Sequence, residues 1–221
     1  MCGRYTLSTV DGPDLAQRFG LIAPPDPETL GRFNVCPTET VAAVLEPGEA
    51  AAVKWGLRPF KSQNYAPINV RAETAGTRYK RLMDASGRCL VLADGWYEWL
   101  KQERKGAPRL PFRYTVDGGA PFAFAGVFDG TGAAILTTEA NAICRPVHDR
   151  MPVVLEGPEA EAAWLSGDVG VQEALEFLVP LADERVSVAP ANPAVNRAGV
   201  EGPGLIEPPP ESITPPADTL F

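Results

Sequence analysis

Residues 109–141, RLPFRYTVDGGAPFAFAGVFDGTGAAILTTEAN, decide the fold class that the sequence predicts. Apolar and β-branched residues fill three runs in this stretch, and the turn signals DGG and DGTG separate them. Strands joined by such short turns pair antiparallel with their neighbours. The segment therefore indicates a mainly antiparallel sheet.

Further strands are expected on the N-terminal side of this stretch. TVAAVLE (40–46) and AAVKWGL (51–57) flank the turn signal EPGE, which predicts a hairpin. RCLVLADGWYEWL (88–100) is strongly strand-like, and CGRYTLS (2–8) has the loose alternation of a short strand. Together these runs make the sheet the main element of the fold.

Short helices are predicted around the sheet at residues 11–21, 77–86, 157–167 and 171–179. With 221 residues, 23 Pro and 21 Gly, the chain fits one large domain that is rich in turns. We expect an α+β fold over residues 1–207, with a strongly curved, mainly antiparallel sheet or open β-barrel and short peripheral helices. Residues 208–221 are predicted to be a Pro-rich C-terminal tail.

The formal net charge of −8 argues against a general nucleic-acid-binding protein, for which a basic balance is expected. The cationic residues are unevenly distributed, because the last 70 residues contain only Arg185 and Arg197. A local basic groove in the first 81 residues therefore remains an alternative to an ordinary solvated surface.

Cysteine usage and hydropathy suggest the cellular setting. The four cysteines, at positions 2, 36, 89 and 144, form no CxxC pair, and the chain has one histidine, so neither a zinc site nor a disulfide framework is expected. The N-terminal stretch lacks the apolar core of a signal peptide, and no run approaches the ~20 apolar residues of a membrane span. We expect a soluble, cytoplasmic protein that contacts no membrane and needs no metal or cofactor.

Cys2 directly follows the initiator methionine, which is usually removed before a small residue. An N-terminal cysteine would carry an α-amine and a thiol two carbons apart, and this pair condenses with an aldehyde to a thiazolidine ring. Reference pKa values of about 8 and about 8.5 predict a usable deprotonated fraction of each group near neutral pH. The alternative is that position 2 lies in an ordinary, poorly ordered terminus.

Asn69, Arg71 and Glu73 in PINVRAET are spaced by two residues, which would place all three on one face of a strand. A polar face in an otherwise apolar stretch is typical of a site. The exposed side of an edge strand would give the same pattern.

Glu98 and His148 are the candidate proton-transfer groups. Alternation in DGWYEWL places Trp96 and Glu98 on one face, where partial burial would raise the carboxyl pKa and suit it to acid–base catalysis. His148 lies at the start of the apolar run in RPVHDRMPVVL, and Arg150 would share its side in an extended segment. A surface glutamate and a structural histidine are the alternatives.

Six motifs, in this order and at these separations, resemble the SRAP family. That family is named for SOS-response-associated peptidases and is understood as enzymes that process abasic sites through DNA–protein crosslinks. The motifs are MCGRYTLS (1–8), RFNVCPTE (32–39), VKWGL (53–57), PINVRAET (67–74), ADGWYEWL (93–100) and HDRMPVVL (148–155). The resemblance extends through the late segment 186–209. The chain departs from it at Cys36, which we interpret as structural, and in loop 57–67.

The resemblance implies a role for particular residues. Cys2 would be the nucleophile that links covalently to the ring-opened abasic sugar in single-stranded DNA, Asn69 would orient it, and Glu98 and His148 would transfer protons. Phosphates would be met by Arg4, Arg71 and Arg150, and the bases by Trp55 and Phe60. Neither a metal nor a cofactor is implied, and we expect a monomer.

Two other functions remain open from the sequence. A cysteine peptidase that cleaves its own Met1–Cys2 bond would also use Cys2 as nucleophile, with His148 or Glu98 as base. A non-catalytic single-stranded-DNA-binding module would not need Cys2, and its affinity would depend steeply on salt.

Overall fold

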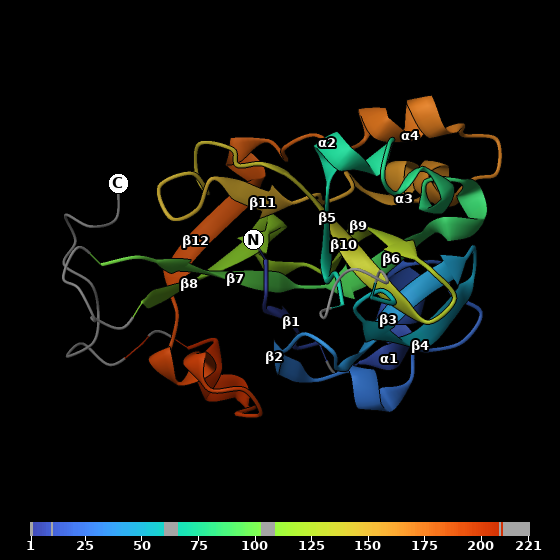
Figure 1. Ribbon diagram of the computed structural model, residues 1–221. Helices are drawn as coiled ribbons and strands as arrows, with labels where there is room; N and C mark the ends of the chain where they lie inside the picture. Colours follow the sequence, from blue (N-terminus) through green and yellow to red (C-terminus); the bar gives the residue numbers. More distant parts are fainter. Residues whose placement is uncertain (1, 10, 60–65, 103–108, 208, 210–221) are drawn as a thin grey trace.

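The computed structural model describes residues 2–9, 11–59, 66–102, 109–207 and 209. Within them lie twelve strands and four α-helices (Figure 1). The strands are β1 (Tyr5–Leu7), β2 (Arg32–Val35), β3 (Thr40–Glu46), β4 (Glu49–Trp55), β5 (Asn69–Arg71), β6 (Arg88–Ala93), β7 (Gly95–Leu100), β8 (Leu110–Val116), β9 (Phe122–Phe128), β10 (Gly132–Glu139), β11 (Arg150–Pro152) and β12 (Val186–Pro190). The helices are α1 (Gly12–Arg18), α2 (Ala72–Ala75), α3 (Pro158–Leu165) and α4 (Val171–Glu176).

Seven strands form a strongly curved sheet whose hydrogen bonding closes on itself. The order β11-β10-β4-β3-β6-β9 is completed by a direct pairing of β9 with β10, so five of its strands form a ring. The hairpin predicted over 40–57 is β3–β4, with Val41 opposite Val53. The fold class is confirmed, since the domain is α+β with a mainly antiparallel sheet and short helices.

Gly132 makes the closure sterically feasible. A Cβ at this position would lie 2.1 Å from the Gly56 carbonyl oxygen and 2.7 Å from that of Lys54, closer than any side chain allows. The first residues of β10 therefore pair parallel with the end of β4. After Ala133 the partner of β10 becomes β5, whose first residue, Asn69, lies opposite Ile135.

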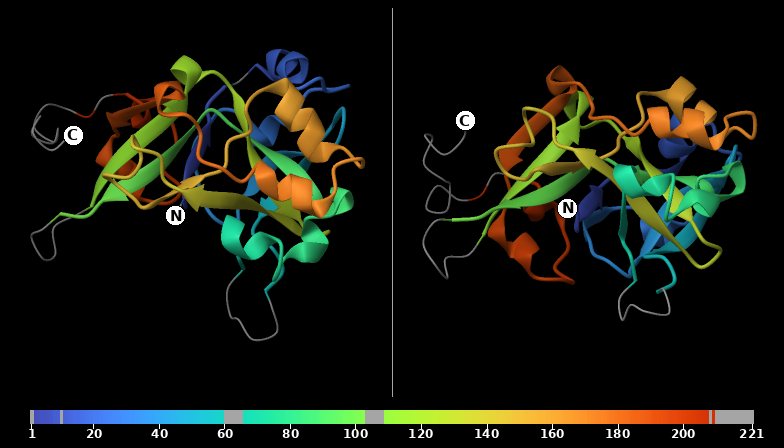
Figure 2. Two further views of the ribbon diagram at one scale, coloured as in Figure 1. Left: turned by 90° about the horizontal axis from the view of Figure 1, so that it is seen from above. Right: turned by 45° about the horizontal axis from the view of Figure 1, so that its top comes forward.

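The second sheet is fully antiparallel and has the order β12-β8-β7-β1-β2. The N-terminal strand β1 lies between β7 and β2, with Tyr5 opposite Trp96. Figure 2 shows the two sheets side by side, with the helices outside them. The N-terminus therefore leads into the interior of a sheet and not along its edge.

Three of the four α-helices, α1, α3 and α4, agree with the predictions, whereas α2 lies where a strand face was expected. The stretch predicted as a helix over 77–86 forms two short 3₁₀ turns, Lys80–Leu82 and Ala85–Gly87. Arg88 follows the second turn, and its buried guanidinium donates to the Met83 carbonyl oxygen at 2.7 Å. Among the described residues, no helix has both the length and the apolar character needed to cross a bilayer. The predicted tail, 208–221, lies outside the described residues apart from Pro209.

Asp94, between β6 and β7, anchors the N-terminal strand. Its buried carboxylate accepts hydrogen bonds from the hydroxyls of Thr6 (2.5 Å), Ser8 (2.7 Å) and Thr9 (3.2 Å), and from the Thr9 backbone N–H (3.0 Å). The Arg113 guanidinium lies 3.4 Å from the same carboxylate and balances its charge. Hydrogen bonds and an ion pair thus compensate the burial of this acid.

We predict that Asp94→Ala lowers the free energy of unfolding by about 3 kcal/mol, because it leaves the Arg113 charge and three hydroxyls without their acceptor. Urea denaturation measures the loss. Asp117→Asn is the matched control, because Asp117 pairs with Arg185 at the surface, and it should cost less than about 1 kcal/mol. Equal losses in the two variants would contradict the anchoring role.

Candidate active site

Cys2 lies just before β1 and is wholly buried. The Asn69 side-chain Nδ2 donates a hydrogen bond of 2.7 Å to the Cys2 carbonyl oxygen. This contact joins the five-stranded sheet to β5 of the barrel sheet. The Oδ1 of Asn69 is buried and has no hydrogen-bond partner among the described residues. The structure therefore brings Asn69 into contact with Cys2, the residue that the family resemblance assigns it to orient.

Glu98, in β7, is 3% exposed. It shares a face of the sheet with Trp96, as the alternation predicted, and its neighbour across the sheet is Phe112. Burial raises the pKa of the Glu98 carboxyl to about 7. At neutral pH this group is close to half ionised, so it can both donate and accept a proton.

The Cys2 thiol differs from the sequence expectation. Its burial raises the pKa well above the ordinary value, and the nearby Glu98 carboxylate raises it further. The thiol is therefore protonated near neutral pH and needs a base before it can act as a nucleophile. Glu98 is a suitable base because its charge and the thiol lie within electrostatic reach of each other.

His148 lies in the turn before β11 and not inside a strand. Its Nδ1 accepts a 3.0 Å hydrogen bond from the Arg150 backbone N–H, which requires an unprotonated Nδ1. The Asp149 carboxylate lies 2.9 Å from the same nitrogen and can pair with it only when the ring is protonated. Burial lowers the pKa of His148, which favours the neutral ring at neutral pH.

The predicted polar face at 69–73 is shorter than expected. The strand ends at Arg71, which is exposed, and Glu73 lies in α2. Glu73 forms a bidentate ion pair with Arg150, whose Nη2 also donates to the Thr137 carbonyl oxygen at 2.6 Å. Arg150, predicted to meet a phosphate, is 8% exposed and instead ties β11 to β10 and α2.

Arg4 lines a small cavity together with Trp99, which was not among the predicted site residues. Its Nη1 donates to Asn34 Oδ1 at 2.8 Å, and its guanidinium carbon lies 6.0 Å from the Trp99 ring centroid. Arg109 and Asn196 complete the lining of this cavity of about 360 Å³. The alternation in DGWYEWL could have indicated Trp99, because this residue follows Glu98 and therefore faces the opposite side of β7.

Trp55 requires a correction, because it was predicted to stack on or wedge DNA. Its side chain is wholly buried, its Nε1 donates to the Ile68 carbonyl oxygen at 2.9 Å, and its ring packs edge-on against Tyr5. A buried ring of this kind is part of the core. Phe60 lies outside the described residues.

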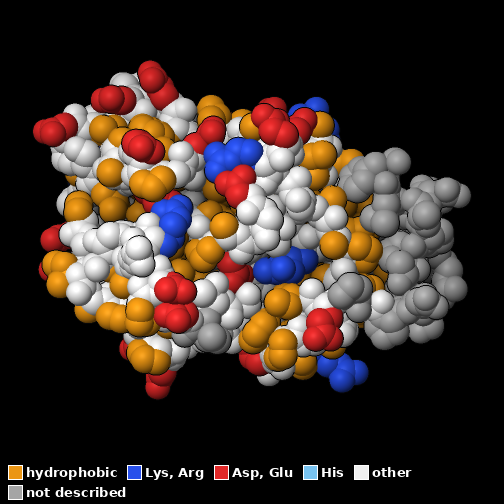
Figure 3. Space-filling model, turned by 180° about the vertical axis from the view of Figure 1, so that it is seen from behind, with side chains coloured by type: hydrophobic (Ala, Val, Ile, Leu, Met, Phe, Trp, Pro, Cys, Tyr) orange, Lys and Arg blue, Asp and Glu red, His pale blue; other side chains and the backbone are white. Residues whose placement is uncertain are grey.

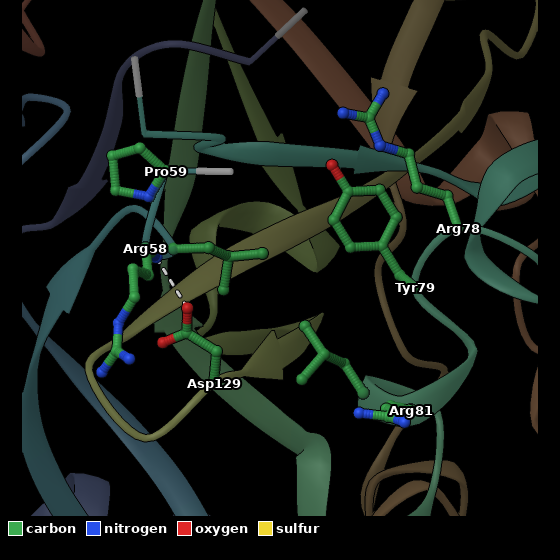
Figure 4. A pocket seen from close by; sticks show the side chains of 8 residues that line it. Arg58, Pro59, Arg78, Tyr79, Arg81 and Asp129 are labelled. Carbon is green, nitrogen blue, oxygen red and sulfur yellow. Dashed lines mark hydrogen bonds between the residues drawn. The ribbon is translucent and has the colours of Figure 1, made fainter. Parts of the chain in front are cut away.

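A second basic cavity, of about 530 Å³, opens beside the segment that follows α2 (Figure 4). Figure 4 shows Tyr79, Arg78 and Arg81 on one side of this cavity and Arg58 and Pro59 on the other. Asp129 accepts a 2.6 Å hydrogen bond from the Arg58 backbone N–H. The lining residues are Leu57, Arg58, Pro59, Arg78, Tyr79, Arg81, Leu82 and Asp129. Three cations against one acid give this cavity a positive balance.

The charges are unevenly spread over the surface. On the face in Figure 3, acidic side chains gather over α3 and α4, whereas Lys and Arg side chains lie nearer the middle. Within the described part of the chain, no three His, Cys, Asp or Glu side chains are grouped as metal ligands.

Comparison with known proteins identifies the family. The family model described as SOS response associated peptidase (SRAP) matches residues 1–198. The abasic site processing protein YedK of Escherichia coli is 33% identical over 225 residues, which cover 94% of this chain and all of YedK. YoaM of Bacillus subtilis, also named an abasic site processing protein, is 32% identical over 75% of this chain and 79% of its own length.

Solved structures share the fold of this chain. A phage-related protein from Bordetella bronchiseptica is 29% identical, with a TM-score of 0.69 over 86% of this chain and 93% of that protein. A protein from Bacteroides thetaiotaomicron has the same fold at 22% identity, with a TM-score of 0.77 over 94% of this chain and 99% of its own. The motifs, the fold and the family model agree, and the chain belongs to the SRAP family.

Proposed function

We propose that this protein acts on abasic sites in single-stranded DNA and links to them covalently through Cys2. Removal of Met1 would free the Cys2 amine, and the amine and thiol would form a thiazolidine with the ring-opened sugar. The observation that carries the proposal is the Asn69 amide bonded to the Cys2 carbonyl, with a buried Glu98 of raised pKa beside the thiol. The names of YedK and YoaM support the substrate class.

The proposed reaction balances without a cofactor. The Cys2 amine adds to the aldehyde carbon, and the resulting carbinolamine loses water to give an imine. The thiol sulfur then adds to the imine carbon, and the thiol proton ends on the nitrogen. Glu98 in its acid form protonates the departing hydroxyl, and its carboxylate accepts the thiol proton. The neutral His148 ring would assist proton transfer at the sugar.

DNA binding is proposed along the arginines on either side of this centre. Arg71 is exposed two residues after Asn69, and the basic cavity with Arg58, Arg78 and Arg81 lies farther along the same segment. On the other side, Arg4 and Trp99 offer a cation beside an aromatic ring, a pairing that suits a phosphate and a stacked base. These local groups would bind the strand although the whole chain is acidic.

We predict that the purified protein forms a heat-stable adduct with a single-stranded oligonucleotide that contains one abasic site, and that Cys2→Ala forms none. Denaturing gel electrophoresis measures the adduct, and mass spectrometry verifies that the chain begins at Cys2. Cys36→Ala is the matched control, because Cys36 is also a buried free cysteine, and it should retain the adduct.

Three results would contradict the crosslinking proposal. An adduct with intact DNA would remove abasic-site specificity, and an adduct in Cys2→Ala would remove the nucleophile. No adduct from a correctly trimmed wild-type chain would leave a self-processing peptidase or a simple binding module.

Asn69→Ala should reduce the rate of adduct formation about tenfold, since it removes one hydrogen bond worth roughly 1–1.5 kcal/mol that orients Cys2. Asn192→Ala is the control, because that side chain donates a similar amide bond to the Gly204 carbonyl oxygen. The rate is measured from quenched time points on the abasic oligonucleotide. An unchanged rate in Asn69→Ala would remove this residue from the site.

We propose that addition of the thiol limits the rate. The rate of adduct formation should then rise as the pH increases through about 7, because the protonated Cys2 thiol needs the ionised Glu98 as its base. Glu98→Gln should abolish this rise of the rate with pH and lower the maximal rate about 100-fold. It should leave the affinity for intact single-stranded DNA unchanged. Rates between pH 5.5 and 8.5 test the first two effects, and fluorescence anisotropy tests the third. A collapse of DNA affinity would instead make Glu98 a structural residue.

A further inference from the structure

Tyr114, in β8, carries a buried hydroxyl that the proposed reaction does not use. The side chain is wholly buried, and its hydroxyl oxygen has no hydrogen-bond partner among the described residues. A phenylalanine would fill the same space, whereas a buried hydroxyl without a partner is destabilising. The position therefore calls for a group that satisfies the hydroxyl in the working site.

The strand register directs this hydroxyl toward the proposed catalytic centre. Tyr114 is the direct cross-strand neighbour of Trp96, and their rings stack with centroids 5.2 Å apart and an interplanar angle of 14°. Glu98 is two residues beyond Trp96 on the same face, so it is the diagonal neighbour of Tyr114. Diagonal neighbours in an antiparallel pair are within reach of an aromatic side chain.

The electrostatics agree with this geometry. Burial raises the pKa of the Tyr114 hydroxyl far above its ordinary value, and the nearby Cys144 and Glu98 raise it further, so the hydroxyl keeps its proton and can donate it. The charged and titratable groups that face Glu98 are the α-amino group of the chain, which lowers its pKa, Cys2 from the N-terminal segment, Tyr114 from β8, and Cys144 and Asp149 from the segment before β11. Tyr114 is the hydroxyl donor in this set.

We propose that Tyr114 is a positioning residue for Glu98, and that its hydroxyl donates a hydrogen bond that reaches the carboxylate through one water molecule. This bond favours the ionised carboxylate and opposes the effect of burial. It lowers the pKa of Glu98 relative to the same site without the hydroxyl and fixes the orientation of the carboxylate oxygens. The inference rests on the proposed function for its catalytic meaning, but the bond itself can be tested without DNA.

The test is Tyr114→Phe, an isosteric change, with Tyr97→Phe as the matched control. Tyr97 is equally buried and neighbours Glu98 in β7, but it faces the other side and its hydroxyl donates to the Phe33 carbonyl oxygen at 2.9 Å. The pKa of Glu98 is read from the ¹³C chemical shift of its carboxyl carbon between pH 5 and 9, with the resonance assigned by its loss in Glu98→Gln.

In Tyr114→Phe we expect the pKa of Glu98 to rise by about 0.5 units or more, because a donor to its charged form is lost. The pH midpoint of adduct formation should move upward by the same amount, with no loss of thermal stability. Tyr97→Phe should leave both midpoints unchanged. If Tyr114→Phe shifts the carboxyl titration by less than 0.2 units, or if both variants shift it equally, the inference is wrong.

The two readouts separate this inference from the proposed function. A protein that forms no adduct but shows the carboxyl shift would retain the Tyr114–Glu98 interaction and lose the crosslinking proposal. If the protein forms the adduct but Tyr114→Phe gives no carboxyl shift, the crosslinking proposal stands and the Tyr114–Glu98 interaction is wrong.

Discussion

The buried carboxylate of Asp94 holds the N-terminal strand in the sheet, and the candidate site depends on this hold. β1 has only three residues, so its ladder alone gives few hydrogen bonds to a segment that begins at the chain terminus. Asp94 adds side-chain and backbone bonds from Thr6, Ser8 and Thr9, just beyond the strand's centre. The orientation of Cys2 is therefore fixed by a strand in the interior of the sheet.

Closure of the barrel sheet supplies the other half of the site. Where β4 ends, β5 takes over its pairing with β10, and the first residue of this short strand is Asn69. The close approach at Gly132 therefore determines where Asn69 begins its strand. The hydrogen bond from Asn69 to Cys2 thus joins two sheets that also pack together through Tyr5 and Trp55. A site built in this way tolerates changes in the peripheral helices better than changes in register.

Local patterns predicted the local features of this structure. Alternation in DGWYEWL placed Trp96 and Glu98 on one face, and EPGE predicted the β3–β4 hairpin. Contacts across long separations could not be predicted from the residues alone, since Asn69 and Cys2 are 67 positions apart, and their proximity was only implied by the family resemblance. The DNA contact of Trp55 was implied by the family resemblance alone, and no local pattern in the sequence shows that this ring lies in the core.

The protonation states of the groups in the site determine the sequence of steps in the proposed reaction. Burial keeps the Cys2 thiol protonated, whereas a free α-amine with a pKa of about 8 has a neutral fraction near pH 7. The amine must therefore attack first, and the thiol can add only when Glu98 is ionised and accepts its proton. Reversal follows the same path, so the acid form of Glu98 returns that proton to the departing sulfur. A carboxyl with a pKa of about 7 serves both directions equally near neutral pH, and the lifetime of the crosslink then depends on how well the site excludes water from the imine.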